Sequence, residues 1–275
     1  MVGSKIDFYN DGNSFVELID FMGNDHSILR AARVSTGGVA EKSPKEDRGL
    51  IRYLWRNKHS SPFEMATFTF HAKIPMFVAT QLNRHRTFSF NYYSQRYSPT
   101  IRDYYTPEEF REQGEKNHQG SGPPLKPELN EVLNKSFTEF CEGALKEYDK
   151  LIESGVSREM ARMVLPENVY TECYFTVDLR NLLHFLELRL HEHAQEEIRS
   201  FAKAIYKILK SLDEFAWSVE AFEDYSLNSV TYTCEENTLL RDLLNMLTNQ
   251  APSLLGDSKV KAVLQKVGVV NGTSD

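Results

Sequence analysis

The chain has 275 residues, of which 41% are hydrophobic and 26% are charged, with a formal net charge of −7 and a pI near 5.7. These are values of a globular protein that is long enough to bury a substantial core. The acidic balance argues against a dedicated nucleic-acid-binding protein, whose affinity comes mainly from neutralising phosphates.

The N-terminal part of the chain predicts alternating strands and helices. Phe15–Phe21 is rich in strand-forming residues, and Ser27–Val34 has the pattern of a short helix. Apolar residues recur at helical spacing in Arg48–Lys58, which predicts a second helix. The strict alternation of Ala66–His71 predicts a strand with its two phenylalanines on one face and its polar side chains on the other.

A helix that starts at Pro75 is expected next, because proline suits the first helical position. We expect this helix to run into Arg84-His85-Arg86, with the basic triplet in its last turn. The aromatic and serine-containing segment 88–96 is expected to follow as a loop. Gly, Pro and Lys are frequent in Glu112–Pro127, which predicts a mobile excursion.

The C-terminal half is mainly helical by its periodicity. Pro127–Ser154 predicts a long amphipathic helix, and Arg158–Leu165 a short one that ends before a proline. Val169–Val177 reads as a strand, and Asp178–Trp217 as either one very long helix or two in succession.

Weaker helical patterns end the chain. Leucines at helical spacing follow Cys234, and a shorter apolar pattern spans Val260–Leu264. The polar tail Asn271–Asp275 predicts disorder.

One basic segment stands out in this acidic chain. Residues 84–96 hold three arginines, one histidine and four aromatic rings, and no Asp or Glu occurs from Met65 to Arg102. Guanidinium groups bind phosphate oxygens, and flat side chains hold heterocycles. The segment therefore predicts a site for a phosphorylated heterocycle. For Arg84 and Arg86 alone, stabilisation of a helix C-terminus by positive charge is an equally good explanation. That explanation does not account for Arg96 or for the hydroxyl and amide groups between Arg86 and Arg96.

A second arginine set lies further along the chain. Arg158 and Arg162 share one helical face, which an anion between them would favour, although a surface pair with Glu159 is the more common arrangement. His184 lies one turn after Arg180, so a ligand on that face would meet both side chains, although His184 could equally form a semi-buried packing pair with Leu188. His184, His191 and His193 lack the spacing of a metal-binding helix, and no metal is expected.

Several common motifs are absent from the sequence. It has no G-x-G-x-x-G after a strand, no P-loop and no nucleophile elbow. The three cysteines are widely spaced, which predicts neither disulfides nor a zinc site and fits a reducing cytoplasm. The first residues lack the apolar core of a signal peptide, and no apolar run is long enough to cross a membrane.

Four ordered segments resemble the flavin-dependent thymidylate synthases between about Phe15 and Phe222. Arg84-His85-Arg86, seven residues and then Ser94 form the signature of that family, and residues 59–64 look like its histidine-containing loop. Residues 153–166 are very similar to its second arginine segment. The stretches 178–180, 184–185, 188–189 and 193–195 resemble its long helix.

The resemblance implies an α/β protein of the α+β type, with a central, mostly antiparallel sheet, long flanking helices and assembly as a homotetramer with active sites shared between subunits. It implies a catalytic domain over residues 1–222, followed by a partly helical extension over 223–275. The implied reaction is reductive methylation of dUMP to dTMP. Methylenetetrahydrofolate would be the carbon donor and NADPH-reduced FAD the hydride source, without a cysteine nucleophile, nucleic acid or membrane partner.

The resemblance also assigns roles to single residues. Arg189 would lie beside the uracil and stabilise ionisation of its N3–H as a fixed cation. His59 would lie near the flavin and folate. Tyr92 stands where some members carry Glu, and Asp178 where Asn is frequent. Catalytic roles fall on Arg189 and His59, FAD contacts on Ser61, Arg84, His85, Arg86, Tyr92, Asp178, Leu179, Arg180 and His184, and dUMP contacts on Gln81, Leu82, Asn83, Arg84, Ser94, Gln95, Arg96, Arg162 and Arg189.

Two other functions compete with this interpretation. A nucleic-acid-binding module could use the aromatic residues of segment 88–96 as stacking platforms beside arginines, but the acidic composition opposes it. A flavoprotein of another reaction class could use a similar pocket, and only identification of its products would distinguish it.

Overall fold

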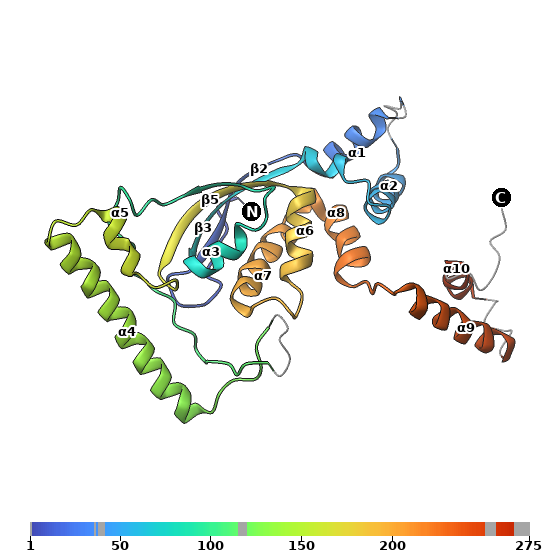
Figure 1. Ribbon diagram of the computed structural model, residues 1–275. Helices are drawn as coiled ribbons and strands as arrows, with labels where there is room; N and C mark the ends of the chain where they lie inside the picture. Colours follow the sequence, from blue (N-terminus) through green and yellow to red (C-terminus); the bar gives the residue numbers. More distant parts are fainter. Residues whose placement is uncertain (1, 36, 38–41, 115–119, 251–256, 267–275) are drawn as a thin grey trace. The chain divides into compact units, whose positions relative to one another are not determined.

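The computed structural model describes residues 2–35, 37, 42–114, 120–250 and 257–266 (Figure 1). The chain divides into two compact units, Met1–Leu227 and Asn228–Asp275. The first unit thus extends slightly past the catalytic domain predicted to end at residue 222. The predicted roles of the two parts remain predictions.

A five-stranded sheet is the centre of the first unit (Figure 1). Its strands lie in the order β1 (Lys5–Ile6), β2 (Phe15–Met22), β3 (Thr67–Pro75), β5 (Tyr170–Asp178) and β4 (Ser89–Tyr92). Every neighbouring pair is antiparallel. The prediction of a mostly antiparallel sheet is therefore confirmed.

The central strand β3 shows why one face of the sheet forms the core. Phe68 and Phe70 are fully buried, whereas Thr69 and His71 on the opposite face are partly exposed. Phe70 stacks on Phe175 of β5, with 5.2 Å between ring centroids. Strict alternation thus places aromatic side chains against the helices, as the sequence predicted.

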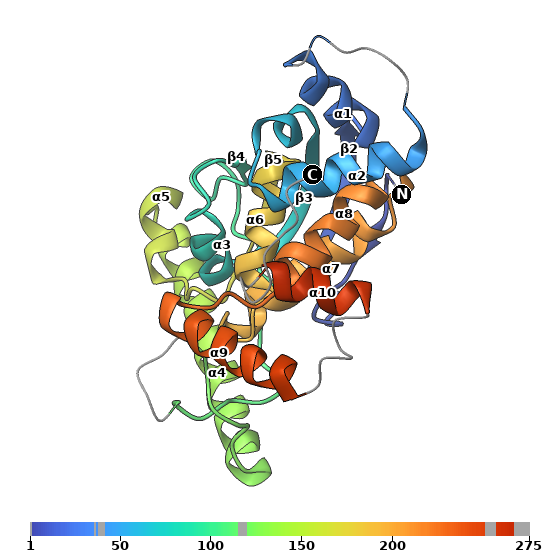
Figure 2. The same cartoon turned by 90° about the vertical axis from the view of Figure 1, so that its right-hand side faces the viewer.

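Helices pack on the apolar face of the sheet. Figures 1 and 2 show α6 and α7 side by side against it, and α4 projecting away from it. The helices of this unit are α1 (Asp25–Val34), α2 (Pro44–Arg56), α3 (Met76–Leu82), α4 (Pro127–Glu153), α5 (Arg158–Ala161), α6 (Leu179–Arg189), α7 (Glu196–Lys210) and α8 (Ala216–Phe222). Short 3-10 or π turns are η1 (Ser61–Met65), η2 (Arg162–Val164), η3 (Asp213–Phe215) and η4 (Glu223–Leu227).

The region around the basic triplet differs from the prediction. Pro75 is the last residue of β3 and the N-cap residue of α3, so it precedes the first helical position. Helix α3 ends at Leu82. The triplet 84–86 therefore lies in the turn after the helix, not in its last turn. Residues 89–92, expected in a loop, form the edge strand β4. Their pairing partners lie far away in β5, so local patterns could not reveal the strand.

The region after Asp178, predicted as either one very long helix or two in succession, forms two successive helices. It contains the separate helices α6 and α7, joined by residues 190–195. Within this connection the Ala194 N–H donates to the His191 carbonyl at 2.9 Å. The Arg199 guanidinium of α7 donates to the Glu192 carbonyl at 2.8 Å. These bonds hold the connection back against the start of α7.

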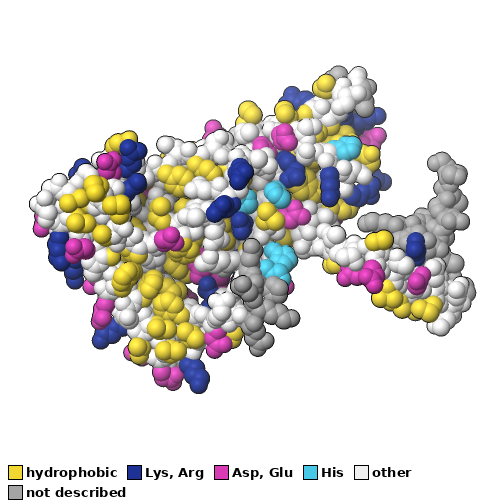
Figure 3. Space-filling model, in the orientation of Figure 1, with side chains coloured by type: hydrophobic (Ala, Val, Ile, Leu, Met, Phe, Trp, Pro, Cys, Tyr) yellow, Lys and Arg dark blue, Asp and Glu magenta, His cyan; other side chains and the backbone are white. Residues whose placement is uncertain are grey.

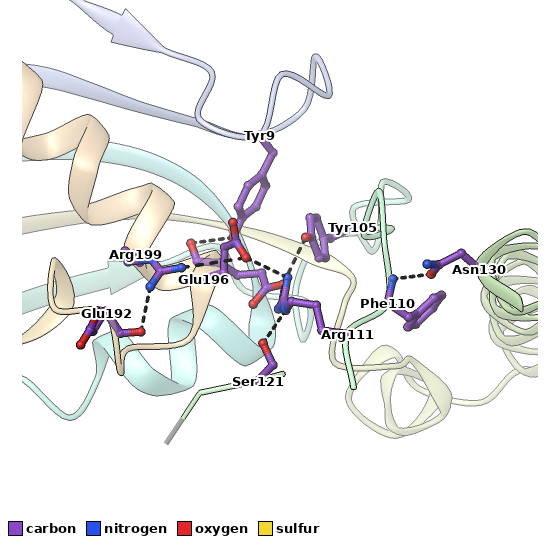
Figure 4. A network of polar contacts seen from close by, with 10 residues as sticks. Tyr9, Tyr105, Phe110, Arg111, Ser121, Asn130, Glu192, Glu196 and Arg199 are labelled. Carbon is purple, nitrogen blue, oxygen red and sulfur yellow. Dashed lines mark hydrogen bonds and ion pairs between the residues drawn. The ribbon is translucent and has the colours of Figure 1, made fainter. Parts of the chain in front are cut away.

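A buried ion pair fastens the long segment between β4 and α4 to α7 (Figure 4). Arg111 donates to Glu197 at 2.7 Å, to Glu196 at 3.3 Å and to the Ser121 hydroxyl at 2.7 Å. The Tyr105 hydroxyl donates to the same Glu197 carboxylate at 3.3 Å. Glu197 is only 4% exposed, so this carboxylate depends on its partners. We call Arg111, Glu196 and Glu197 the α7 clamp.

The second unit contains α9 (Cys234–Gln250) and α10 (Ser258–Lys266), which confirms both weak helical patterns. The tail predicted to be disordered lies outside the described residues, as does part of the excursion predicted at residues 112–127. None of the described helices combines the length and apolar content needed to cross a bilayer.

Candidate active site

The turn after α3 is the centre of the candidate site. Backbone N–H groups of Asn83, Arg84 and His85 donate to carbonyls of the preceding helix at 2.9, 3.2 and 3.0 Å. Arg84 and Arg86 are exposed, while His85 between them is only 8% exposed. Figure 3 shows basic side chains gathered on this face between α3 and α6. The turn thus presents two cations outward and one imidazole inward.

On one side of the turn is a cavity of about 220 Å³. It joins residues from α3, β4, η2 and β5 that are far apart in sequence. Its lining includes Asn83, Tyr92, Gln95 and Arg162, all predicted ligand contacts, together with Met76, Ala79, Thr80, Tyr93 and Thr171. The structure therefore brings a predicted phosphate-binding arginine to the turn that carries Arg84. We call this the substrate cavity.

Tyr92 lies in the substrate cavity, beside residues predicted to bind dUMP, although its own predicted partner is FAD. Its hydroxyl donates to Asn83 Oδ1 at 2.9 Å. Burial raises the pKa of Tyr92, so its phenol remains a neutral hydrogen-bonding group. A carboxylate at this position would add a negative charge next to the basic turn.

The segment after β4 carries Gln95 and two more of the predicted contacts, Ser94 and Arg96. Ser94 accepts at its carbonyl from the N–H of Tyr97 at 3.2 Å, which forms a tight turn. The Gln95 amide donates to Thr100 at 3.3 Å, and the Arg96 guanidinium lies 3.9 Å from Glu159. The partly exposed Arg96 pair is long, so a phosphate could displace the carboxylate.

Gln81, at the end of α3, meets a residue that was not among the predicted site residues. Its side-chain amide donates to Gln195 Oε1 at 2.5 Å. Gln195 ends the connection between α6 and α7, so the contact joins two distant segments. The side chain of Leu82 is fully buried, so any ligand contact from Leu82 would come from its backbone.

On the other side of the turn, His85 meets Arg189. The Nε–H of Arg189, the last residue of α6, donates to His85 Nε2 at 3.1 Å. Burial, reinforced by the positive charge of Arg189, lowers the pKa of His85 to about 4. Burial also lowers the pKa of Arg189 from its usual value. A partly buried guanidinium thus lies against a neutral imidazole.

The start of α6 holds three predicted flavin contacts. Asp178 caps the helix: its carboxylate accepts from the backbone N–H of Asn181 at 2.9 Å and from its side chain at 2.6 Å. An acidic cap at a helix N-terminus is favourable, which gives Asp178 a structural reason to be there. Leu179 is fully buried, and its N–H donates to the Ala66 carbonyl at 2.8 Å. Arg180 lies 6.0 Å from the Trp55 ring.

His59 and Ser61 line a larger cavity of about 650 Å³ between α1, α2 and η1. Arg33 and Lys42, which were not predicted as site residues, also line it. Nothing in the local sequence connects those cations with residue 59; only the packing of α1 against η1 does. We call this space the His59 cavity.

The backbone at the end of α2 fixes the position of His59. The N–H groups of Lys58 and His59 donate to carbonyls of Trp55 and Leu54 at 3.0 and 2.9 Å, which is a Schellman motif. Lys58 has a φ of 58° in the left-handed region, where glycine is the usual residue. The exposed His59 ring then lies edge-on to Tyr53, at 5.8 Å.

A third cavity, of about 420 Å³, lies along the end of α6 and includes His184, His191 and His193. The His184 imidazole is 3.9 Å from Glu187. Within the parts of the chain that the structure describes, no group of three or more His, Cys, Asp or Glu side chains has an arrangement that could hold a metal ion.

Five of the predicted site arginines lack, in the part of the chain that the structure describes, the carboxylate partner that Arg96, Arg102 and Arg111 have. Among the described residues, no carboxylate forms an ion pair with any of five site arginines, namely Arg84, Arg86, Arg162, Arg180 and Arg189. Positive charge at a phosphate site has to be available to the ligand. The charge at this turn is therefore suited to phosphate and pyrophosphate groups, and these residues fit a flavin dinucleotide without a Rossmann loop.

The predicted residues fall into separate groups within one subunit. The turn links the substrate cavity, through Asn83, to Arg189, through His85. His59 and Ser61 line a different cavity, and no described contact joins them to the turn. The linings of the two cavities have no residue in common.

Comparisons with known proteins identify the family of this chain. A family model described as thymidylate synthase complementing protein (Thy1) matches residues 17–213. The chain is 47% identical to a flavin-dependent thymidylate synthase of Thermus thermophilus, over 92% of this chain and 93% of that protein. It is 44% identical to one of Dictyostelium discoideum, over 79% of this chain and 71% of that protein.

Solved structures show the same fold. A crystal structure of the UMP/dUMP methylase PolB from Streptomyces cacaoi, bound with 5-Br dUMP, matches with a TM-score of 0.70 and 35% identity. The match covers 77% of this chain and 95% of that one. A second structure of the same methylase, bound with 5-Br UMP, has the same score and identity, with coverages of 78% and 96%.

Proposed function

Because this chain belongs to the Thy1 family of flavin-dependent thymidylate synthases, we propose that it methylates dUMP to dTMP, with methylenetetrahydrofolate as carbon donor and NADPH as reductant of bound FAD. The observation that carries the proposal is the set of site arginines without carboxylate partners around the turn after α3. Such a set is suited to two phosphorylated ligands with heterocyclic rings.

The substrate cavity is the proposed place of the dUMP phosphate. Arg162 lines it, and Arg84 and Arg96 lie on the segments beside it. Guanidinium groups can bind a phosphate with two parallel hydrogen bonds. Ser94 and Gln95 add hydroxyl and amide donors. Binding by these groups orients the uracil ring relative to Arg189.

Arg189 is the proposed activating residue for the pyrimidine. Its guanidinium keeps its charge at any physiological pH and cannot act as a base. Beside the uracil edge, it would stabilise negative charge as the ring N3–H ionises. Its partly buried position strengthens this effect, because charge interactions are less screened away from water.

FAD would be held by the exposed arginines of the turn, by Arg180 and His184 of α6, and by Ser61. Bound FAD, once reduced by NADPH, supplies the hydride for the new methyl group. The chain's own contribution would be to hold the pyrophosphate by guanidinium groups. His59 would lie near the entering folate.

The cysteines support methylation without a protein thiolate. Cys141 and Cys173 are buried, and burial raises the pKa of Cys173 to about 12 and raises that of Cys141 as well. Both therefore remain thiols, which are poor nucleophiles. Cys234 belongs to the second unit. No cysteine lines the substrate cavity as described.

We also propose that the protein is a cytoplasmic homotetramer whose active sites are completed by neighbouring subunits. The predicted catalytic residues His59 and Arg189 have no described contact that joins them within one chain, which supports shared sites. Apolar side chains gather over α4 in Figure 3, where Val132 is 64% and Phe140 63% exposed. Exposed apolar patches favour protein contacts. Light scattering after gel filtration would test the mass, and a fully active monomer would contradict the proposal.

The direct test incubates purified protein with dUMP, methylenetetrahydrofolate and NADPH and identifies products by mass spectrometry. We expect a flavin spectrum that dUMP perturbs, and dTMP that forms only when all three compounds are present. NADPH oxidation without dTMP would instead favour a flavoprotein of another class. Binding to nucleic acid that weakens steeply with salt, in protein without flavin, would favour the nucleic-acid module.

UMP is a second candidate substrate, because the structural neighbour is named as a methylase of both UMP and dUMP. The same assay with UMP in place of dUMP distinguishes the two. The ratio of kcat/KM for dUMP and UMP then gives the substrate preference of the enzyme.

A further inference from the structure

The contact between His85 and Arg189 joins two segments that are distant in sequence. Arg189 ends α6, and His85 lies in the turn after α3. The Nε–H of Arg189 points at His85 Nε2, 3.1 Å away. A last-turn arginine without a partner would sample many rotamers, and ordering it costs entropy. The imidazole fixes the guanidinium in advance.

The imidazole is itself held in place. Phe185 of α6 meets its ring edge-to-face at 4.9 Å, and Phe88 lies at 5.7 Å. His85 is 8% exposed, and its backbone N–H donates to the Leu82 carbonyl. The position of the acceptor nitrogen is therefore set by packing and by the backbone turn.

This contact uses only one of the five N–H groups of Arg189. The Nε–H is taken by His85, and four N–H groups remain on the two terminal nitrogens. In the planar guanidinium one terminal N–H runs parallel to the anchored Nε–H, and the other three point away from it. That arrangement suits a group that has to meet the edge of a flat ring.

The charges around His85 keep its acceptor nitrogen unprotonated. Arg189 and His184 of α6 face it, and Arg84 and Arg86 flank it in the turn. Burial and the positive charge of Arg189 lower the pKa of His85 to about 4. The imidazole is thus neutral at pH 7, with its proton on Nδ1 so that Nε2 can accept.

We propose that His85 is a positioning residue that acts through Arg189: it accepts the Arg189 Nε–H and thereby aims the guanidinium at the pyrimidine. This inference rests on the proposed function for the identity of the pyrimidine. The role differs from the flavin contact predicted from the sequence, because it concerns the substrate side of the site.

Two substitutions separate this role from simple packing. His85→Phe keeps an aromatic ring between Phe88 and Phe185 but removes the acceptor, whereas His85→Gln retains an acceptor oxygen. For His85→Phe we expect kcat with saturating dUMP to fall about 100-fold, because the reacting groups are no longer aligned. We expect the KM for dUMP to change little, and turnover is measured at saturating FAD because His85 is also a predicted FAD contact. His85→Gln should stay within about tenfold of wild type.

A double substitution tests whether the effect passes through Arg189. Arg189→Lys keeps the positive charge but has no Nε–H donor of this geometry. Adding His85→Phe to Arg189→Lys should cause no further loss of kcat, because the contact is already absent. A second loss of the full size would overturn the proposal, and so would wild-type kcat in His85→Phe.

Nuclear magnetic resonance of protein labelled with nitrogen-15 in histidine gives a measurement without turnover. At pH 7 the His85 signal should report an unprotonated Nε2, and Arg189→Lys should shift it. A protonated Nε2 would overturn the proposal even if the variants were unstable. If wild-type protein failed to methylate dUMP, the proposed function would be wrong, while this spectrum would still decide the contact.

Discussion

Arg111 and Arg189 are both partly buried guanidinium groups, but the fold surrounds them in opposite ways. In the α7 clamp, Arg111 meets the carboxylates of Glu196 and Glu197. At the turn after α3, Arg189 meets only the neutral imidazole of His85 among the contacts described. One charge is neutralised within the protein, and the other remains available.

The difference separates stability from function. A buried ion pair with both partners present compensates the cost of desolvation, so loss of either partner is expensive. A partly buried cation without an anion is less favourable in the empty protein, and a bound anion can relieve this cost. The α7 clamp therefore stabilises the folded state, whereas the arginines at the turn keep their charge available for a ligand. Four measurements test this distinction.

The largest effect is expected at the turn. Arg84→Ala removes a charged donor from between the two proposed ligands and should lower kcat/KM for dUMP by about 100- to 1,000-fold. Flavin content at low FAD concentration should fall as well. The thermal midpoint of the FAD-free protein should stay near that of wild type, since no described carboxylate loses a partner. Normal turnover, or a large drop in that midpoint, would show that Arg84 does not serve ligand binding in this way.

The clamp should show the reverse behaviour. Arg111→Ala leaves the Glu197 carboxylate buried without its cation and should lower the free energy of unfolding by about 3–5 kcal/mol. Urea unfolding followed by circular dichroism measures this value. The double variant Arg111→Ala, Glu197→Gln is the control, and it should recover part of the loss because the buried charge is gone. If the single variant is as stable as wild type, the clamp is not a stabilising pair.

The pH dependence of stability reports on the imidazole at the turn. The pKa of His85 is about 4 in the folded protein and about 6.5 in the unfolded chain, so the unfolded chain binds a proton more readily between these values. As pH falls from about 6.5 to 4, His85 should therefore remove about 2–3 kcal/mol of stability. The difference between wild type and His85→Phe isolates this contribution from the carboxylates. Equal pH profiles for the two proteins would exclude it.

The smallest effect is expected on the surface of α2. Arg48 pairs with Glu220 of α8 at 2.6 Å, but its side chain is 54% exposed. Ion pairs in water contribute little, so Arg48→Ala should leave the free energy of unfolding nearly unchanged, as measured by urea unfolding. Arg52→Ala is the matched comparison, since Arg52 is less exposed and meets both Glu220 and Asp224. Equal and large losses for both variants would show that exposure does not distinguish these pairs.

Much of the fold could be predicted because the periodic patterns are local. The alternation around Phe68 predicted β3, and the apolar spacing after Pro127 predicted α4. The errors occurred where distant partners decide the structure. Residues 89–92 form β4 because β5 supplies their hydrogen bonds. The basic triplet lies outside α3 because the helix ends at Leu82.

The candidate site shows the same division. Spacing and family resemblance point to Arg84, Arg162 and Arg189 as ligand contacts, but they do not indicate which side chains surround these arginines. Arg33 of the His59 cavity and Gln195 beside Gln81 were missed, since each meets its neighbours only after folding. Their local sequence carries no sign of the contact.

Residue order and short periods were thus enough to predict β2, β3 and β5, the amphipathic helices and the family to which the chain belongs. Only the tertiary structure decided that Arg111 meets carboxylates and that Arg189 meets an imidazole. Both are arginines in an acidic chain, and their residue types are identical. Charge compensation depends on distance in space, and the partners of these two residues come from segments about 85 and 104 positions away.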